Sequence, residues 1–140
     1  MSFPERTVVT GAGLAGFRVV EELRRRGYPG QITLIGAEDR PPYDRPPLSK
    51  KVLTAGIDPS LHADFKALDV DFRPGETAIA LESPPGAPAA PAAPAVPRAA
   101  RAARARASAS TLVTNRDKYP CEHLVVATGA IPVTLPGPGR

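Results

Sequence analysis

The clearest chemical signal in the sequence is a glycine-rich turn, Gly11-Ala-Gly-Leu-Ala-Gly16. In this spacing Gly11 permits a tight bend, Gly13 lets the backbone approach a pyrophosphate, and Gly16 lets a helix lie close to a sheet. The N–H groups at the start of that helix, at Leu14 and Ala15, would face the phosphates. The turn therefore predicts a dinucleotide-phosphate site, and a purely structural glycine turn is the alternative.

An acidic residue, Glu38, follows this turn at the end of the next expected strand. Its carboxylate could accept hydrogen bonds from both ribose hydroxyls of an adenosine. The same carboxylate would repel a 2′-phosphate, so it disfavours NADP at this site without distinguishing NAD from FAD. A solvated glutamate with no ligand is the alternative interpretation.

The elements around the turn form a strand–helix–strand unit. Residues 7–10 are a β-branched run that predicts a buried strand, and Gln31–Gly36 predicts a second. Between them, apolar residues recur at helical spacing from Gly16 to Leu23, and Gly27 stands where a helix C-terminal glycine is expected. The connection is short enough to require a parallel, right-handed crossover.

The elements expected beyond this unit are shorter. Residues 37–47 contain four prolines and predict an irregular loop. Short helices are expected over residues 48–53, with Ser49 as the cap, and over residues 61–68. Short strands are expected over residues 70–72, 77–81, 111–114 and 124–127, with a turn at residues 115–117.

Residues 83–110 form a low-complexity segment, with six prolines between Pro84 and Pro97 and an Ala/Arg tract after them. The segment has almost no large side chains to bury, so it predicts an extended stretch followed by weak helix rather than packed structure. It divides the chain into three parts, residues 1–82, 83–110 and 111–140.

The net charge of +4 comes from this segment. It holds four arginines and no acidic residue, which leaves 14 basic and 14 acidic residues in the rest of the chain. A generally basic surface that coats nucleic acid is therefore not supported. A role for the segment alone as an interaction tail for an acidic partner or nucleic acid is a separate alternative.

The single cysteine, Cys121, excludes a disulfide framework, a CxxC redox pair and a cysteine-based zinc cluster within this chain. We interpret Cys121 as structural. His62 and His123 have no partners at metal or general-base spacing, so no metal site is expected.

The start of the chain does not resemble a secretory signal, and its most apolar run, residues 124–127, is too short to cross a bilayer. A cytoplasmic location is therefore expected.

Two further strings carry a resemblance to a known family. They are Pro42-Tyr-Asp-Arg-Pro-Pro-Leu-Ser-Lys50 and the strand at residues 124–127 with Thr128-Gly129 after it. Together with the glycine turn and Glu38, they resemble the NAD(P)H-dependent ferredoxin, rubredoxin and putidaredoxin reductases of the pyridine nucleotide-disulfide oxidoreductase superfamily. The resemblance implies an α/β, Rossmann-like FAD-binding βαβ domain of the flavoproteins that have two dinucleotide-binding folds. The domain would be incomplete here, with residues 1–82 and 111–140 as its two segments.

The resemblance also implies roles for individual residues. Glu38 would hold the FAD ribose, Arg45 would lie at the adenine and pyrophosphate side, and Lys50 would be the catalytic lysine near the isoalloxazine ring. Such a cation can stabilise the negative charge that develops when hydride reaches the flavin. The other implied cofactor contacts are Ala78, at the adenine, and Thr128 and Gly129, at the pyrophosphate.

In the intact family, NAD(P)H reduces FAD, which passes electrons to a ferredoxin- or rubredoxin-type iron–sulfur protein. The chain has no CxxxxC pair, which excludes the branch that reduces disulfides. Ile131 stands where the family usually has an arginine, and the low-complexity segment would remove a strand of a small β-meander. The NAD(P)H-binding and C-terminal domains have no room in 140 residues, so a truncated form is expected. The alternative is a nucleotide-binding module without turnover.

Overall fold

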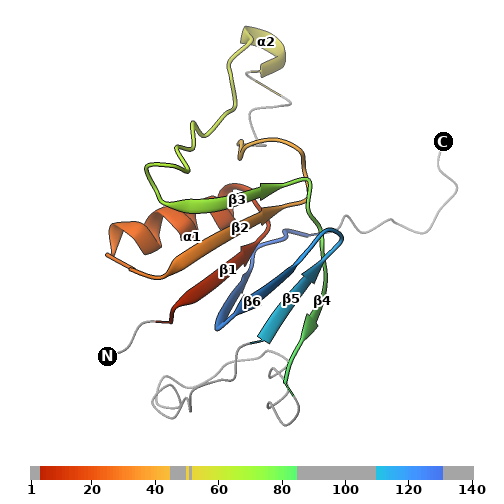
Figure 1. Ribbon diagram of the computed structural model, residues 1–140. Helices are drawn as coiled ribbons and strands as arrows, with labels where there is room; N and C mark the ends of the chain where they lie inside the picture. Colours follow the sequence, from red (N-terminus) through yellow and green to blue (C-terminus); the bar gives the residue numbers. More distant parts are fainter. Residues whose placement is uncertain (1–3, 45–49, 51, 85–109, 131–140) are drawn as a thin grey trace, which may run out of the picture.

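The computed structural model describes residues 4–44, 50, 52–84 and 110–130 (Figure 1). Within them the chain forms two sheets and one long helix. The elements, in chain order, are β1 (Arg6–Thr10), α1 (Leu14–Arg25), β2 (Gln31–Gly36), α2 (Leu53–Ala55), β3 (Val70–Pro74), β4 (Ala78–Glu82), β5 (Ser110–Thr114), β6 (Lys118–Cys121) and β7 (His123–Val126).

The first sheet is parallel and has the strand order β3-β2-β1-β7. Residue Val8 of β1 lies beside Thr33 of β2 on one side and Leu124 of β7 on the other. The chain leaves β1 through α1 toward β2 and returns much later to the opposite side of β1. The strand order therefore reverses at β1, and in open α/β sheets ligands bind at such a switch point, outside the carboxyl ends of the strands.

The helix α1 ends at a glycine with a left-handed backbone conformation. Its C-terminus is closed by Gly27, at φ 73°, whose N–H donates to the carbonyl of Arg24, while the N–H of Tyr28 donates to that of Leu23. These two bonds are the pair that defines a Schellman C-cap, and a left-handed residue such as glycine is required between them. The predicted helix and its terminal glycine are therefore confirmed.

The parallel sheet is the middle of three layers (Figure 1). Alternation along each strand sends neighbouring residues to opposite faces. Val9 and Leu34 pack with Val20 of α1 on one face, whereas Val8 and Ile35 pack on the other face against the second sheet. The two middle strands, β1 and β2, are buried at every position after their first residue because both faces are covered, as is usual for parallel sheets.

The second sheet is antiparallel, with the order β4-β5-β6. β4 and β5 pair directly, although the low-complexity segment connects them, and residues 85–109 of that segment lie outside the described residues. Ser110, expected at the end of the segment, already belongs to β5. The described residues form three strands in this sheet, and the expected loss of a strand at the segment stays a prediction.

Two expected helices differ from the structure. Residues 61–68 do not form a helix; residues 65–69 form a turn, and the N–H of Leu68 donates to the carbonyl of Asp64. His62, before this turn, and Asp69, at its end, have positive φ values of 49° and 50°, which a helix cannot include. Half of residues 48–53, including Ser49, lies outside the described residues; Lys50 and Val52 have π-helical geometry, and α2 begins at Leu53. No helix in the described part of the chain is long and apolar enough to span a membrane.

Candidate functional site

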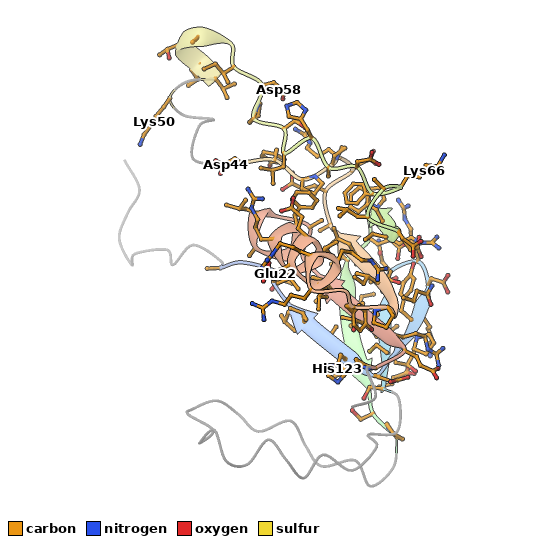
Figure 2. All side chains as sticks on the ribbon, turned by 90° about the vertical axis from the view of Figure 1, so that its left-hand side faces the viewer. Glu22, Asp44, Lys50, Asp58, Lys66 and His123 are labelled. Atoms are coloured by element: carbon orange, nitrogen blue, oxygen red, sulfur yellow. The ribbon has the colours of Figure 1, made fainter. Side chains whose placement is uncertain are left out.

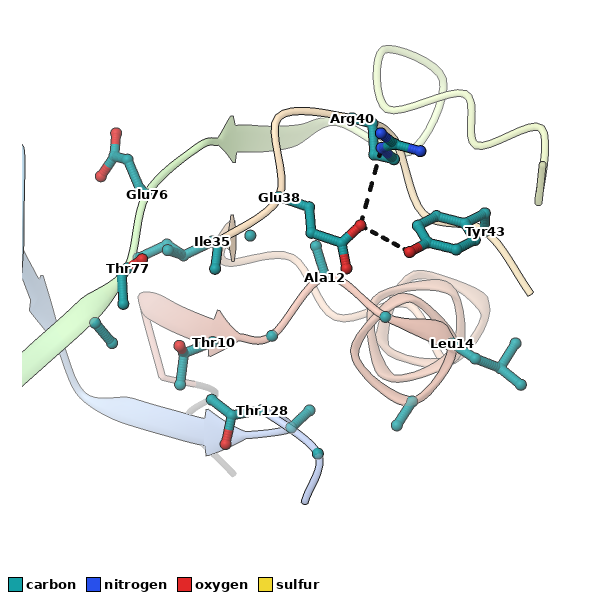
Figure 3. A pocket seen from close by; sticks show the side chains of 18 of the residues that line it. Thr10, Ala12, Leu14, Ile35, Glu38, Arg40, Tyr43, Glu76, Thr77 and Thr128 are labelled. Carbon is teal, nitrogen blue, oxygen red and sulfur yellow. Dashed lines mark hydrogen bonds and ion pairs between the residues drawn. The ribbon is translucent and has the colours of Figure 1, made fainter. Parts of the chain in front are cut away.

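A pocket with a volume of about 420 Å³ opens at the carboxyl ends of β1, β2 and β7 (Figure 3). The start of α1 forms its floor, the loop after β2 forms one wall, and the residues between β3 and β4 form another. The lining residues are Thr10 to Ala15, Ile35 to Glu38, Arg40, Pro41, Tyr43, Asp44, Glu76 to Ala78, and Ala127 to Gly129.

Two of the three motif glycines are required by contacts within the protein. Gly11 has φ 104°, and its N–H donates to the carbonyl of Ile35 at 2.8 Å. A Cβ at Gly11 would overlap the carbonyl of Ala127 at the end of β7. A Cβ at Gly16 would overlap the carbonyl oxygen of Gly11. These glycines therefore allow the turn, the helix and β7 to meet without side chains between them.

The third motif glycine, Gly13, differs because a Cβ there would meet no atom within 4 Å. Its φ of −81° is accessible to any residue, so neither backbone strain nor packing within the protein requires glycine. Gly13 precedes α1, and its carbonyl accepts the first helical hydrogen bond, from Phe17. The N–H groups of Leu14 and Ala15 have no acceptor within the helix, and both residues line the pocket.

Glu38 lies on the wall formed by the loop after β2. The hydroxyl of Tyr43 donates to its Oε2 at 2.8 Å, and the Nε of Arg40 lies 3.9 Å from the same oxygen (Figure 3). The carbonyl of Glu38 accepts a hydrogen bond from the N–H of Gly75, which connects this wall to the opposite one. The Glu38 side chain is 42% exposed, so its carboxylate is accessible from the pocket.

The opposite wall contains Glu76, whose carboxylate is buried. Its oxygens accept hydrogen bonds from the hydroxyl of Thr114, at 2.9 Å, and of Tyr119, at 2.9 and 3.0 Å. Burial, followed by the hydrogen bond and the negative charge of Glu76, raises the pKa of Tyr119 to about 12. The neighbouring Thr77 donates its N–H to the Oδ1 of Asn115. The β5–β6 hairpin therefore holds this wall in place.

Most of the predicted site residues meet in this pocket. Its lining includes Gly11, Gly13, Leu14, Ala15, Glu38, Ala78, Thr128 and Gly129. Gly16 does not line the pocket but packs beneath it. Arg45 and Ile131 lie outside the described residues.

Lys50 does not line the pocket. It is exposed and lies beside α2, on the segment that extends away from the sheets (Figure 2). Its proposed position near a flavin ring stays a prediction.

The sequence did not single out Arg40, Tyr43 or Glu76 as pocket residues. Tyr43 belongs to the string at residues 42–50 that carries the family resemblance, so the string itself was a usable signal. Glu76 gave none, because its partners Thr114 and Tyr119 are about 40 residues away and contact it only in the fold.

The remaining candidate side chains lie away from this chemistry. Cys121 is buried in the core between the two sheets, and burial raises the pKa of its thiol. This agrees with its interpretation as a structural residue. His62 and His123 are exposed, and no group of three or more His, Cys, Asp or Glu in the described residues could hold a metal ion.

The fold is that of a Rossmann-like α/β domain. The sequence profile of the pyridine nucleotide-disulphide oxidoreductase family matches residues 5–140, and the chain belongs to this family. Curated relatives match the chain over about 50 residues. It is 50% identical over 50 residues to the ferredoxin–NAD(+) reductase subunit of the benzene 1,2-dioxygenase system of Pseudomonas putida. It is 49% identical over 51 residues to rhodocoxin reductase of Rhodococcus erythropolis.

These matches cover 36% of the chain and 12% of each relative. Solved structures match nearly the whole chain. The crystal structure of Fdr9 has a TM-score of 0.70 and 39% identity, and the match covers 97% of this chain and 29% of that one. The putidaredoxin reductase in its covalent complex with putidaredoxin has a TM-score of 0.69 and 25% identity, with 96% and 28% covered. The chain therefore spans less than a third of the length of these relatives.

Proposed function

We propose that the pocket binds the ADP half of FAD. The observation that carries this proposal is the open space in front of Gly13, which lies where the N–H groups at the start of α1 face the pocket. Nothing within the described protein needs glycine at this position, whereas an approaching pyrophosphate would. The site lies at the switch point of the sheet, where such ligands bind.

In this proposal each wall has a part of the ligand to hold. The N–H groups of Leu14 and Ala15 bind the pyrophosphate from the helix start, and Thr128 and Gly129 approach it from the end of β7. Glu38 accepts hydrogen bonds from the ribose, and the backbone of Ala78 contacts the adenine. FAD, when bound, supplies the redox chemistry, and the protein supplies binding and orientation. Lys50 and Arg45 remain predicted contacts of the cofactor.

The activity of the whole protein is inferred from the relatives of the chain. We infer that the chain contributes the FAD site of an oxidoreductase in which NAD(P)H is the electron donor. The proposed acceptor is a ferredoxin- or rubredoxin-type iron–sulfur protein. The names of the relatives support both inferences, since they include ferredoxin and rubredoxin reductases. The single, buried Cys121 is consistent with a cytoplasmic location for this reaction.

A second candidate is a nucleotide-binding module without turnover. It is favoured by the pocket itself, whose described lining is assigned here only to the ADP half of the ligand. The two candidates differ in NAD(P)H oxidation by the chain in the presence of FAD. Saturable oxidation above the rate with free flavin would support the oxidoreductase, whereas a rate equal to free flavin would support the module.

The proposed binding is tested by titrating the isotope-labelled chain with ADP-ribose and with pyrophosphate while NMR shifts are followed. A few backbone donors, the helix dipole and one carboxylate predict affinities of roughly millimolar to tens of micromolar. Glu38→Ala should weaken ADP-ribose more than pyrophosphate, because the carboxylate meets only the ribose. Gly13→Val should weaken both ligands, because its side chain would fill the phosphate space.

A matched control is Glu21→Ala, which removes a glutamate from α1 outside the pocket. It should leave both affinities unchanged. If the protein is folded and neither Glu38→Ala nor Gly13→Val changes binding, the glycine turn is structural and the proposal fails.

A further inference from the structure

Two described side chains of the same loop contact the Glu38 carboxylate. They are the hydroxyl of Tyr43 at 2.8 Å and the Nε of Arg40 at 3.9 Å, and both distances are measured to Oε2. The shorter contact is a hydrogen bond to a charged group, whereas the longer one lies beyond hydrogen-bond distance. Oε2 is thereby held at the loop, and the other oxygen points toward the pocket floor near Ala12 (Figure 3).

Tyr43 is itself held by contacts that do not involve Glu38. Pro42, the residue before it, is fully buried, and its carbonyl accepts a hydrogen bond from the N–H of Leu61. The next residue, Asp44, donates its N–H to the carbonyl of Pro59 at 2.8 Å. Tyr43 also forms an isolated β-bridge with Ser60. The backbone on both sides of Tyr43 is therefore fixed to residues 59–61, and its hydroxyl has a defined position.

Arg40 is a second group toward which the Glu38 carboxylate can turn. Its guanidinium lies 5.7 Å from the centroid of the Tyr43 ring and close to Oε2 of Glu38. A carboxylate that lost the Tyr43 hydrogen bond could turn toward this cation, because opposite charges at this distance attract. A closer approach of the two groups than in the present ion pair, at 3.9 Å, would draw the carboxylate toward the loop and away from the pocket.

We propose that Tyr43 is a positioning residue of the nucleotide site, whose hydroxyl holds the Glu38 carboxylate in the orientation that receives the ribose. This inference rests on the proposed binding of the ADP half of FAD. Its physical basis is preorganisation: a carboxylate already fixed in its binding orientation loses less freedom when the ligand arrives. Tyr43 also connects the ribose position to residues 59–61, so this segment should respond when ADP binds.

The test is Tyr43→Phe, which keeps the ring beside Arg40 and removes only the hydroxyl. ADP should bind about threefold to tenfold more weakly, the range expected for the net contribution of one ordinary hydrogen bond, because Tyr43 acts on the ligand only through Glu38. Pyrophosphate should bind unchanged, since it does not meet Glu38. In the Glu38→Ala background, Tyr43→Phe should have no further effect on ADP, because the group it positions is gone. ADP should also shift the amide signal of Ser60 in the wild type, and less so in Tyr43→Phe.

Tyr28→Phe is the control, since it removes a buried hydroxyl that bonds to Thr7 and Pro4 away from the pocket. It should lower stability and leave the ratio of ADP to pyrophosphate affinity unchanged. Equal losses for both ligands in Tyr43→Phe, or an equal loss of ADP binding with and without Glu38, would overturn the positioning role. If Glu38→Ala and Gly13→Val both leave ADP binding unchanged, the proposed function fails as well, so the two failures are distinguishable.

Discussion

The phenol of Tyr119 donates to the carboxylate of Glu76 at about the same distance from both oxygens, 2.9 and 3.0 Å. Both groups are buried, and Thr114 donates to the same carboxylate. The contact joins β6 to the residue that begins the wall between β3 and β4. A buried carboxylate must be hydrogen-bonded to be tolerated, and this one receives both bonds from the hairpin that follows the low-complexity segment.

The Tyr119–Glu76 contact predicts a dependence of stability on pH at the alkaline end. The pKa of Tyr119 in the folded protein, about 12, lies above its usual value of 10.0, so folding favours the neutral phenol. The resulting stabilisation is fully present below about pH 10 and is lost as the pH rises through 12. The tyrosinate absorbance of the wild type should contain a component near pH 12 that Tyr119→Phe removes.

Tyr119→Phe should also lower the free energy of unfolding by about 1–3 kcal/mol at neutral pH, because it leaves a buried carboxylate with fewer donors. The difference between wild type and variant, measured by urea unfolding, should shrink between pH 10 and 12. A constant difference across that range would contradict the assignment of the raised pKa to Tyr119.

The contact between Asn115 and Thr77 makes a prediction about the pocket. The two residues exchange hydrogen bonds, with Asn115 Oδ1 accepting from the N–H of Thr77 and the carbonyl of Thr77 accepting from the N–H of Asn115. Asn115→Ala should cost about 0.5–1.5 kcal/mol of stability. It should also weaken adenosine and ADP, but not pyrophosphate, because it loosens the wall assigned to the adenine.

Asn115→Asp is the matched variant, since it keeps an oxygen acceptor at the same place. It should bind ADP more tightly than Asn115→Ala in the same titration. If both variants bind ADP as the wild type does, the hairpin does not support the adenine wall.

The sequence predicted the part of the fold whose causes are local. The turn from Gly11 to Gly16, the helix closed by Gly27, and the two flanking strands all follow from sterics and periodicity within neighbouring residues, and all are confirmed. The strand β6 was missed because Lys118 and Pro120 do not favour strands, and only pairing with β5 makes one. Local signals cannot report such long-range pairing.

The wrong helix over residues 61–68 has a similar cause. Leu61, Phe65 and Leu68 recur at helical spacing, yet the structure uses a single turn to bury Phe65 and Leu68 against the core beneath α1. Phe65 stacks on Phe72 of β3 at 4.3 Å between ring centroids. The apolar spacing correctly indicated side chains that pack on the core, but they do so without a helix. The positive φ values of His62 and Asp69 are incompatible with a helix that includes these residues.

Two motif glycines should separate stability from binding. Gly16→Ala places a Cβ on the carbonyl oxygen of Gly11, which is backbone and cannot rotate away. It should destabilise the fold by about 1–3 kcal/mol or more, as overpacking does. Gly13→Ala meets no atom within 4 Å, so its effect on stability should stay within about 1 kcal/mol, the range for an N-cap change.

The same pair should behave differently toward ligands. Gly13→Ala should remain folded and bind pyrophosphate more weakly than the wild type, since its methyl group points into the proposed phosphate space. Thermal unfolding and NMR titration of the same samples measure both properties. A folded Gly13→Ala protein with unchanged pyrophosphate affinity would contradict the proposed phosphate position.

The three consecutive arginines at the end of α1 look equivalent in the sequence, but only one is built into the fold. The Arg24 side chain is 15% exposed, and its guanidinium donates to four backbone carbonyls, at 2.6 to 2.9 Å, which belong to Tyr28, Gly30, Leu68 and Asp69. Arg25 and Arg26 are largely exposed and pair with Glu22 on the helix surface. Arg24 therefore fastens the end of α1 to the segments before β2 and β3.

Replacing these arginines by lysine tests the difference, because lysine keeps the charge but lacks the planar fork that reaches several acceptors. Arg24→Lys should lower the free energy of unfolding by about 1.5–3 kcal/mol, since a charged donor to several carbonyls is lost. Arg25→Lys should have little effect, because exposed ion pairs contribute little to stability. Urea unfolding of both variants measures the contrast. Equal effects of the two substitutions would show that the carbonyl contacts of Arg24 do not stabilise the fold, and that it behaves as one more surface cation.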